Sequence, residues 1–122
     1  MRDKTDKKLL GRWGEQAAAE YLRRRGYRIV GMNYSCRMGE IDVIAEDARY
    51  LAFVEVKLRR DSLHGLAREF VTPAKQRRLI AAAELWLQSN PTAKQPRFDV
   101  VEIYGKNGVI EEMNHIENAF TL

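Results

Sequence analysis

Hydrophobic positions recur along the chain with two different periods, and these periods predict its helices and strands. Residues 5–25 repeat apolar side chains every three or four positions, which is the period of an amphipathic helix. A second helical pattern begins at Thr72-Pro73, because threonine caps helices well and proline suits the first helical position. Shorter runs rich in β-branched and aromatic residues predict five strands, at 27–34, 40–45, 51–58, 97–104 and 109–113. The predicted order is α-β-β-β-α-β-β.

The apolar faces of these elements predict how they pack. In the first helix the recurring apolar residues are Leu10, Trp13, Ala17 and Tyr21, with Gly14, Ala18 and Leu22 widening the stripe on one side. In the second helix the expected buried residues are Leu79, Ala82, Ala83 and Trp86, with Ile80 and Leu87 beside them. The second and third strand runs are apolar on both sides, so helices should cover both faces of the sheet. We therefore expect an α/β fold with a central mixed β-sheet flanked by helices.

Chain length and the absence of linkers favour one domain. The 122 residues suit a single domain spanning 1–122, and no repeat or low-complexity tract divides the chain. We expect about the first five residues to lie outside the ordered fold, as chain termini often do. The polar segment 59–71 has no clear period, so we expect a loop with one turn of helix there.

Charged residues interrupt the two most apolar strand runs. Asp42 lies in the second run, and Glu55 and Lys57 lie in the third. Because side chains alternate between faces along a strand, Glu55 and Lys57 share one face. A four-residue loop after Glu46 pairs that residue with Leu51 and places Asp42 across from Glu55, with Cβ atoms roughly 5 Å apart. Like charges in this relation destabilise a hairpin, so we expect something to compensate them.

A divalent cation is the simplest compensation for this acid pair. Mg²⁺ prefers oxygen ligands and usually takes one or two carboxylates from a protein, and we expect Mn²⁺ to substitute for it. Lys57, beside such a site, is placed to orient or help deprotonate a water and to stabilise charge on a phosphate. The alternative interpretation is a solvated salt bridge between Glu55 and Lys57, which is common on strand surfaces.

Two further acids have two interpretations each. Glu15 lies at the rim of the buried stripe of the first helix, where it can face a cleft or be an ordinary surface residue. Asp99 shares a strand face with apolar residues and is either another site acid or a structural partner of Arg97 or Arg12. We favour the structural role for Asp99, because buried acids usually have partners.

Basic residues follow the third strand and begin the second helix. The chain carries 21 Lys+Arg against 17 Asp+Glu, a formal net charge of +4, which is compatible with nucleic acid or an anionic surface. Cations at a helix N-terminus oppose the helix dipole, and a bound phosphate would relieve that conflict. The alternative is a solvated basic face. The candidate phosphate contacts are Arg59, Arg60, Arg68, Lys75, Gln76, Arg77 and Arg78.

Cysteine usage and hydropathy predict a cytoplasmic protein without a membrane segment. Cys36 is the only cysteine, so no internal disulfide forms, which favours a reducing compartment. No run approaches the length of a transmembrane helix, and the charged N-terminus lacks the apolar core of a secretory signal. His64 and His115 are isolated in the sequence and with Cys36 do not make a zinc site.

Four strings of residues resemble the YraN family. They are Gly14-Glu15, GEIDVIA at 39–45, FVEVKLR at 53–59 and RFDVV at 97–101. YraN proteins are predicted endonucleases, similar to archaeal Holliday junction resolvases and part of the restriction-endonuclease-like PD-(D/E)xK superfamily. The resemblance extends from about Leu10 to Met113, and the chain departs from the superfamily signature only in that Ile41, not proline, precedes Asp42.

The resemblance implies roles for individual residues. Asp42 and Glu55 match the metal-binding acids, and Lys57 matches the catalytic lysine. Glu15 matches the acid that the first helix contributes in resolvase-like members. The backbone carbonyl of Val56 is implied as an additional metal ligand. DNA is the implied partner, and a homodimer is left open because resolvase-like relatives are often dimers.

The sequence thus predicts a Mg²⁺-dependent DNA endonuclease that hydrolyses phosphodiester bonds, with branched or damaged DNA as the substrate class implied by the resemblance. The alternative is a catalytically inactive module on the same fold that binds nucleic acid or a protein partner. A third interpretation is a structural scaffold with a tolerated acid pair. That scaffold predicts a more stable fold when one acid is removed.

Overall fold

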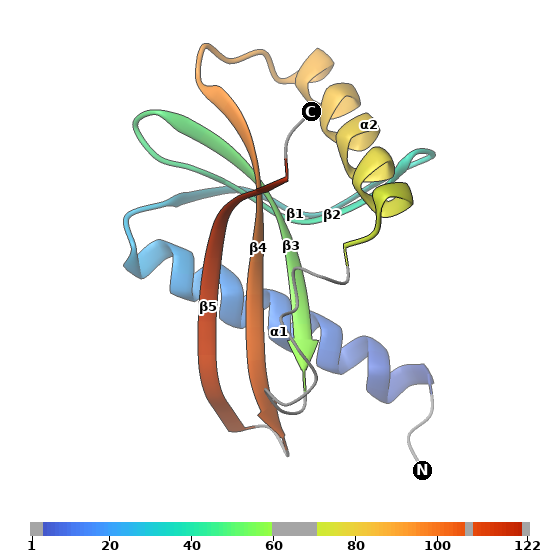
Figure 1. Ribbon diagram of the computed structural model, residues 1–122, viewed down its shortest axis with the longest axis vertical. Coiled ribbons are helices and arrows are strands. Elements are labelled where there is room, and N and C mark those ends of the chain that lie inside the picture. The colour runs from blue at the N-terminus through green and yellow to red at the C-terminus, as the bar shows by residue number, and fades with distance from the viewer. Residues whose placement is uncertain (1–3, 60–70, 107–108, 121–122) are drawn as a thin grey trace.

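The helices and strands follow one another in the predicted order (Figure 1). The computed structural model describes residues 4–59, 71–106 and 109–120. The elements are α1 (Lys4–Arg24), β1 (Arg28–Cys36), β2 (Gly39–Glu46), β3 (Tyr50–Arg59), α2 (Pro73–Ser89), β4 (Gln95–Lys106) and β5 (Val109–Phe120). The expected α/β fold is therefore confirmed. The helix α1 already begins at Lys4, inside the segment expected to lie outside the ordered fold. Most of the loop expected at 59–71 lies outside the described residues.

The strands form a single mixed sheet in the order β1-β2-β3-β4-β5 (Figure 1). The strands β3 and β4 are parallel, and the other neighbouring pairs are antiparallel. Parallel neighbours need a crossover of a dozen or more residues, usually through a helix. The helix α2 lies in that crossover and allows β4 to run parallel to β3.

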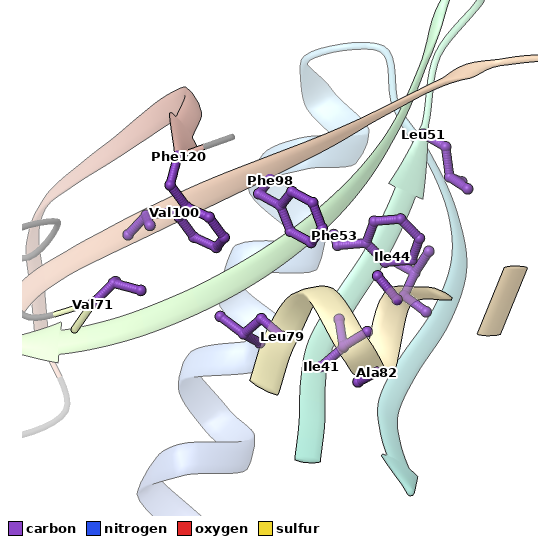
Figure 2. Close-up of a cluster of buried hydrophobic side chains, with 11 residues drawn as sticks. Ile41, Ile44, Leu51, Phe53, Val71, Leu79, Ala82, Phe98, Val100 and Phe120 are labelled. Carbon is purple, nitrogen blue, oxygen red and sulfur yellow. The ribbon is translucent and has the colours of Figure 1, made fainter. Parts of the chain in front are cut away.

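The two helices cover opposite faces of the sheet, as predicted. On one face, α2 buries Leu79, Ala82 and Ala83 against residues such as Ile41 and Phe53 (Figure 2). On this face aromatic rings stack along the sheet, with centroid distances of 5.6 Å for Phe53–Phe98 and 5.0 Å for Phe98–Phe120. On the other face, α1 contributes Ala18 and Leu22 to a cluster completed by strand residues, namely Val43, Val54, Val101 and Ile103 among others.

The side of α1 that faces the core carries the three residues that widen the predicted apolar stripe. Gly14, Ala18 and Leu22 are buried, whereas Trp13 is 37% exposed, so its assignment to the core was wrong. Small residues prevail here because α1 lies close to β3. A methyl group at Gly14 would sit 3.0 Å from the Leu58 side chain.

The register of the β2–β3 hairpin is the predicted one. Glu46 pairs with Leu51, and the pairing continues to Val43 with Val54. The strand β3 begins at Tyr50, so the loop is one residue shorter than expected. Asp47 fixes this loop, because its carboxylate accepts hydrogen bonds from the N–H groups of Arg49 and Tyr50, both at 2.8 Å.

The strand β5 is longer than its sequence pattern suggests. It continues to Phe120, although the apolar pattern predicts an end near Met113. The extension contains a register shift opposite Phe98 and Val100 and a positive φ of 53° at Asn118, and both obscure the two-residue period. Among the residues described, neither helix is long and apolar enough to cross a membrane.

Candidate functional site

The sheet opens between β2 and β3 directly below the predicted hairpin. Their pairing ends at Val43 with Val54, yet β2 remains paired to β1 as far as Gly39, and β3 remains paired to β4 as far as Arg59. The two strands therefore separate because each follows its other neighbour. The first side chains beyond the last pair are those of Asp42 and Glu55.

The Asp42 side chain spans the start of this opening. The backbone N–H of Val56 donates to the Asp42 carboxylate at 2.8 Å. In an antiparallel ladder a residue directs both its N–H and its C=O toward the same neighbouring strand. Continued strand geometry would direct the carbonyl of Val56 to the same side, and its role as an oxygen ligand stays a prediction.

Three acids interact electrostatically at the opening. Burial, then the negative charge of Glu55, raises the pKa of Asp42 to about 7, although the Val56 N–H opposes this shift. Burial also raises the pKa of Glu15, although interactions with the side chains of Asp42 and Asn33 oppose this shift. The helix α1 thus places Glu15 beside the acids of the sheet, and its role in a site stays a prediction. The negative charge of the three acids, Glu15, Asp42 and Glu55, is only partly compensated by the protein.

Two lysines approach the same oxygen atom of Glu55. Lys75 Nζ lies 2.7 Å from Glu55 Oε1, and Lys57 Nζ lies 3.6 Å from it. Burial, followed by the charge of Lys75, lowers the pKa of Lys57. Burial works in the same direction on Lys75, but its contact with Glu55 prevails and raises the pKa of Lys75. The predicted salt bridge between Glu55 and Lys57 is therefore accompanied by a second, shorter one.

Cavities lie on both sides of the acids. One, of about 270 Å³, is lined by residues that include Asp42, Glu55, Lys75 and Arg78. The other, of about 530 Å³, is lined by Gly11, Arg12, Glu15, Asn33 and Glu40. Glu40 borders both cavities, so the site is accessible from the α1 side and from the α2 side of the sheet.

The donor set suits a hard cation that keeps part of its water shell. Within the described residues, no three His, Cys, Asp or Glu side chains are grouped as a preformed metal cage. Mg²⁺ does not need such a cage, because it usually binds one or two carboxylates and keeps several waters. Asp42 and Glu55 could supply that pair, and burial together with the charge of Glu55 makes ionisation of Asp42 unfavourable without a nearby cation.

The predicted phosphate contacts divide into several groups. Lys75 and Arg78 line the cavity beside Glu55, and Arg77 is exposed on α2 without lining it. Gln76 uses its amide to donate to the Val71 carbonyl at 2.9 Å, so it holds the chain before α2. Arg59 lies at the end of β3. Arg60 and Arg68 are outside the described residues.

Comparisons with known proteins agree on one family. The sequence model of the Uncharacterised protein family UPF0102 matches residues 14–103. The chain belongs to this family. The matched span contains Glu15, Asp42, Glu55, Lys57 and Lys75.

Similar UPF0102 proteins match this chain along nearly their whole length. The "UPF0102 protein" of Geotalea uraniireducens is 44% identical over 121 residues, covering 98% of this chain and 95% of the relative. That of Pelotomaculum thermopropionicum is 42% identical and covers 93% and 97%, respectively. That of Syntrophomonas wolfei is 46% identical and covers 91% and 96%. The similarity therefore extends over more than nine-tenths of both chains in each comparison.

Asp99 lies in a separate polar cluster of this UPF0102 protein. Arg97 forms a bidentate contact with it, through Nε at 2.9 Å and Nη2 at 2.8 Å. His115 Nε2 lies 2.7 Å from the same carboxylate, and the Asn118 N–H donates to it at 3.0 Å. These hydrogen bonds outweigh burial and lower the pKa of Asp99. The favoured structural role of Asp99, with Arg97 and not Arg12 as its partner, fits this geometry.

Two contacts in the structure were not predicted from the sequence. Lys75 was predicted as a phosphate contact, whereas its ammonium group forms an ion pair with Glu55. The signal was a lysine three residues after the N-cap Thr72, where a capping box would place glutamate. His115 was interpreted as isolated, but this side chain is fully buried against Asp99. No local pattern connects these two residues, because β5 reaches β4 only through the folded sheet.

Proposed function

We propose that this protein is a metal-dependent DNA endonuclease. The observation that supports this most is the opening between β2 and β3, where Asp42, Glu55, Glu15 and Lys57 converge from two strands and one helix. Three interacting acids at a place where two strands separate destabilise the sheet, so a purely structural role does not explain them. A hydrolase that binds a cation and a phosphate requires such a group.

Asp42 and Glu55 would hold Mg²⁺, with the Val56 carbonyl as a further ligand and Glu15 on the α1 side. When bound, the metal would polarise the phosphodiester and lower the pKa of a bound water. Asp42 must be ionised to act as a ligand. Its pKa of about 7 therefore predicts that metal affinity rises with pH up to and beyond neutrality.

Lys57 would serve the attacking water and the scissile phosphate. Its side chain is only 23% exposed, and its ammonium group lies 3.6 Å from Glu55 Oε1, so the group is both oriented and partly desolvated. The lowered pKa of Lys57 eases the release and recovery of a proton, which suits a residue that helps to deprotonate water. In its charged form it would stabilise the negative charge that develops on the phosphate.

The DNA backbone would lie along the N-terminal half of α2. Arg78 lines the cavity beside the acids, and Arg77 is exposed on the same helix. Contacts of this kind bind phosphates and give affinity, not sequence choice. Recognition of the shape of DNA, with branched or damaged substrates as the proposed class, would agree with such contacts.

Cleavage assays on DNA of different shapes test the proposal. The parent protein and a Glu55→Gln variant are incubated with labelled linear, flapped and four-way-junction DNA in Mg²⁺ and in Mn²⁺. A Glu84→Gln variant is the matched control, because Glu84 is exposed on α2 away from the lining of either cavity. We expect Glu55→Gln to lose cleavage by a factor of about 10² or more, as when a preorganised charged group is removed. The control should cleave like the parent.

One result would overturn the proposal. If the parent cleaves none of these substrates but binds DNA as tightly as Glu55→Gln does, the protein is a binding module on a nuclease-like fold. The different DNA shapes then report the preference of that module. Cleavage that persists in Glu55→Gln would instead indicate a contaminating nuclease.

A further inference from the structure

The contact between Lys75 and Glu55 joins α2 to the acid site. Lys75 Nζ lies 2.7 Å from Glu55 Oε1, which is close for an ion pair and shorter than the 3.6 Å contact of Lys57 with the same oxygen. The Glu55 side chain is only 6% exposed. This carboxylate therefore has little access to water and depends on the two ammonium groups for its charge balance.

The position of Lys75 is costly unless the lysine serves Glu55. The residue occupies the third position of α2, and its own N–H donates to the Thr72 cap at 3.1 Å. The positive end of the helix dipole lies here and disfavours a cation. No acidic residue in the first turn of α2 offsets it. Glu55 is thus the anion that makes this lysine favourable.

A cation and the ammonium group compete for Glu55. The carboxylate has lone pairs for both, but a divalent ion and an ammonium group on the same oxygen repel one another at contact distance, so each weakens the binding of the other. Lys75 is able to leave, because its side chain is 40% exposed and the cavity that it lines also contains Arg78. Lys57 is more enclosed than Lys75 and lies on the same strand as Glu55.

We propose that Lys75 is the internal counter-ion of the cation site and that a divalent cation displaces it into the cavity, where it becomes a phosphate contact. This inference rests on the proposed function, because it assumes a cation at Asp42 and Glu55. Binding of the cation and of a polyanion is then positively coupled. The cation releases the lysine that the polyanion needs, and the polyanion keeps the lysine away from the cation site.

Titration of Mn²⁺ into the free protein tests the first half of the proposal without any catalysis. Isothermal calorimetry compares the parent, Lys75→Gln, Lys94→Gln and Glu55→Gln. Lys94 is a matched control, because it forms a 3.1 Å ion pair with Glu46 at the opposite end of the hairpin. We expect Lys75→Gln to bind Mn²⁺ about 5- to 50-fold more tightly than the parent, within the usual range for coupled sites. Lys94→Gln should bind like the parent.

A DNA-binding measurement tests the second half. Fluorescence anisotropy of a labelled 30-base-pair duplex is recorded with and without Ca²⁺, which also takes carboxylate and carbonyl oxygens. In the parent, Ca²⁺ should tighten DNA binding several-fold. In Lys75→Gln this tightening should be largely lost, because no lysine remains to be released. Thermal melting of each variant confirms that the fold is intact.

The outcomes separate this inference from the proposed function. Equal or weaker Mn²⁺ binding by Lys75→Gln, with Mn²⁺ binding lost in Glu55→Gln, overturns the counter-ion role and leaves the metal site in place. Mn²⁺ binding by Lys75→Gln but not by the parent supports the role strongly. If neither protein binds Mn²⁺ through Glu55, the cation site and the counter-ion role both fall.

Discussion

Asp42 and Asp99 both lie within strands among apolar residues, but their surroundings treat the negative charge in opposite ways. Asp99 is fully buried and receives hydrogen bonds from Arg97 and the Asn118 N–H, so its pKa is lowered despite its burial. Asp42 is also largely buried, and it lies beside the negative charges of Glu55 and Glu15, which the Val56 N–H does not offset, so its pKa rises to about 7. Burial therefore raises the pKa of both carboxyl groups, and only at Asp99 do the hydrogen bonds outweigh it.

The difference separates a structural acid from a candidate functional one. A group that is completely satisfied has nothing left to offer a ligand, whereas a group that is incompletely satisfied gains from one. The same sheet holds both kinds of aspartate. The distinction is visible only in the environment that each strand creates.

The largest expected effect comes from breaking the satisfied cluster. Asp99→Asn keeps the shape of the side chain but removes the carboxylate that pairs with Arg97, whose side chain is only 7% exposed. Removing one partner of a buried ion pair costs about 3 to 5 kcal/mol of unfolding free energy. Urea unfolding followed by circular dichroism measures this loss. Glu20→Gln, at an exposed acid of α1, is the control, and equal stability of both variants would contradict the structural role of Asp99.

A smaller effect of opposite sign is expected at Asp42. The folded protein holds a proton there up to a pH of about 7, whereas an ordinary aspartate has a pKa near 3.8. The unfolded chain therefore binds fewer protons between these values, and stability contributed by this group is lost as pH rises from about 4 to 7. Asp42→Asn cannot ionise and should be more stable than the parent at pH 8 by about 1 to 3 kcal/mol, discounted for partial exposure.

The dependence of the unfolding free energy on pH tests this prediction at Asp42. Unfolding free energies of the parent and Asp42→Asn should converge near pH 4 and separate as pH rises. Asp99 acts in the other direction, because its lowered pKa makes its contribution disappear at acid pH. Parallel profiles for the parent and Asp42→Asn would show that Asp42 is an ordinary, ionised aspartate.

The smallest expected effect concerns the helix that brings Lys75 to the site. Thr72→Ala removes the side-chain oxygen that accepts the Lys75 N–H, and loss of such a cap costs about 1 kcal/mol. Thermal unfolding measures the loss. Thr72→Ser is the control, because serine keeps the hydroxyl group and should restore the stability of the parent. A variant with serine as unstable as the one with alanine would point to packing of the threonine methyl group.

Local chemistry made much of this fold predictable. The cap at Thr72 and Pro73 located α2, and the alternating pattern with the short loop after Glu46 gave the register of β2 and β3. The same register places Asp42 and Glu55 directly beyond the last pair, Val43 with Val54, and their role as site acids stays a prediction. These features depend on residues close together in the chain, where pattern and geometry are directly linked.

The remaining features depend on contacts between distant segments. The separation of β2 from β3 arises because each strand stays with its other neighbour, which no local pattern encodes. The contact of Lys75 with Glu55 requires the rotation and depth of α2 over the sheet. The burial of His115 against Asp99 requires β5 to run beyond the end of its apolar pattern.

The opening between β2 and β3 also divides the molecule mechanically. The backbone pairing that joins β2, which carries Asp42, to β3 extends from Val43–Val54 to Glu46–Leu51, and beyond it the Val56 N–H reaches the Asp42 side chain. Glu55 and Lys57 belong to β3, which is paired with β4 along its length. A ligand that bridges Asp42 and Glu55 would connect β2 to β3 beyond the end of their pairing. Such a ligand would restrict local opening of the β1–β2 hairpin, so its amide hydrogens should exchange more slowly when the ligand is bound.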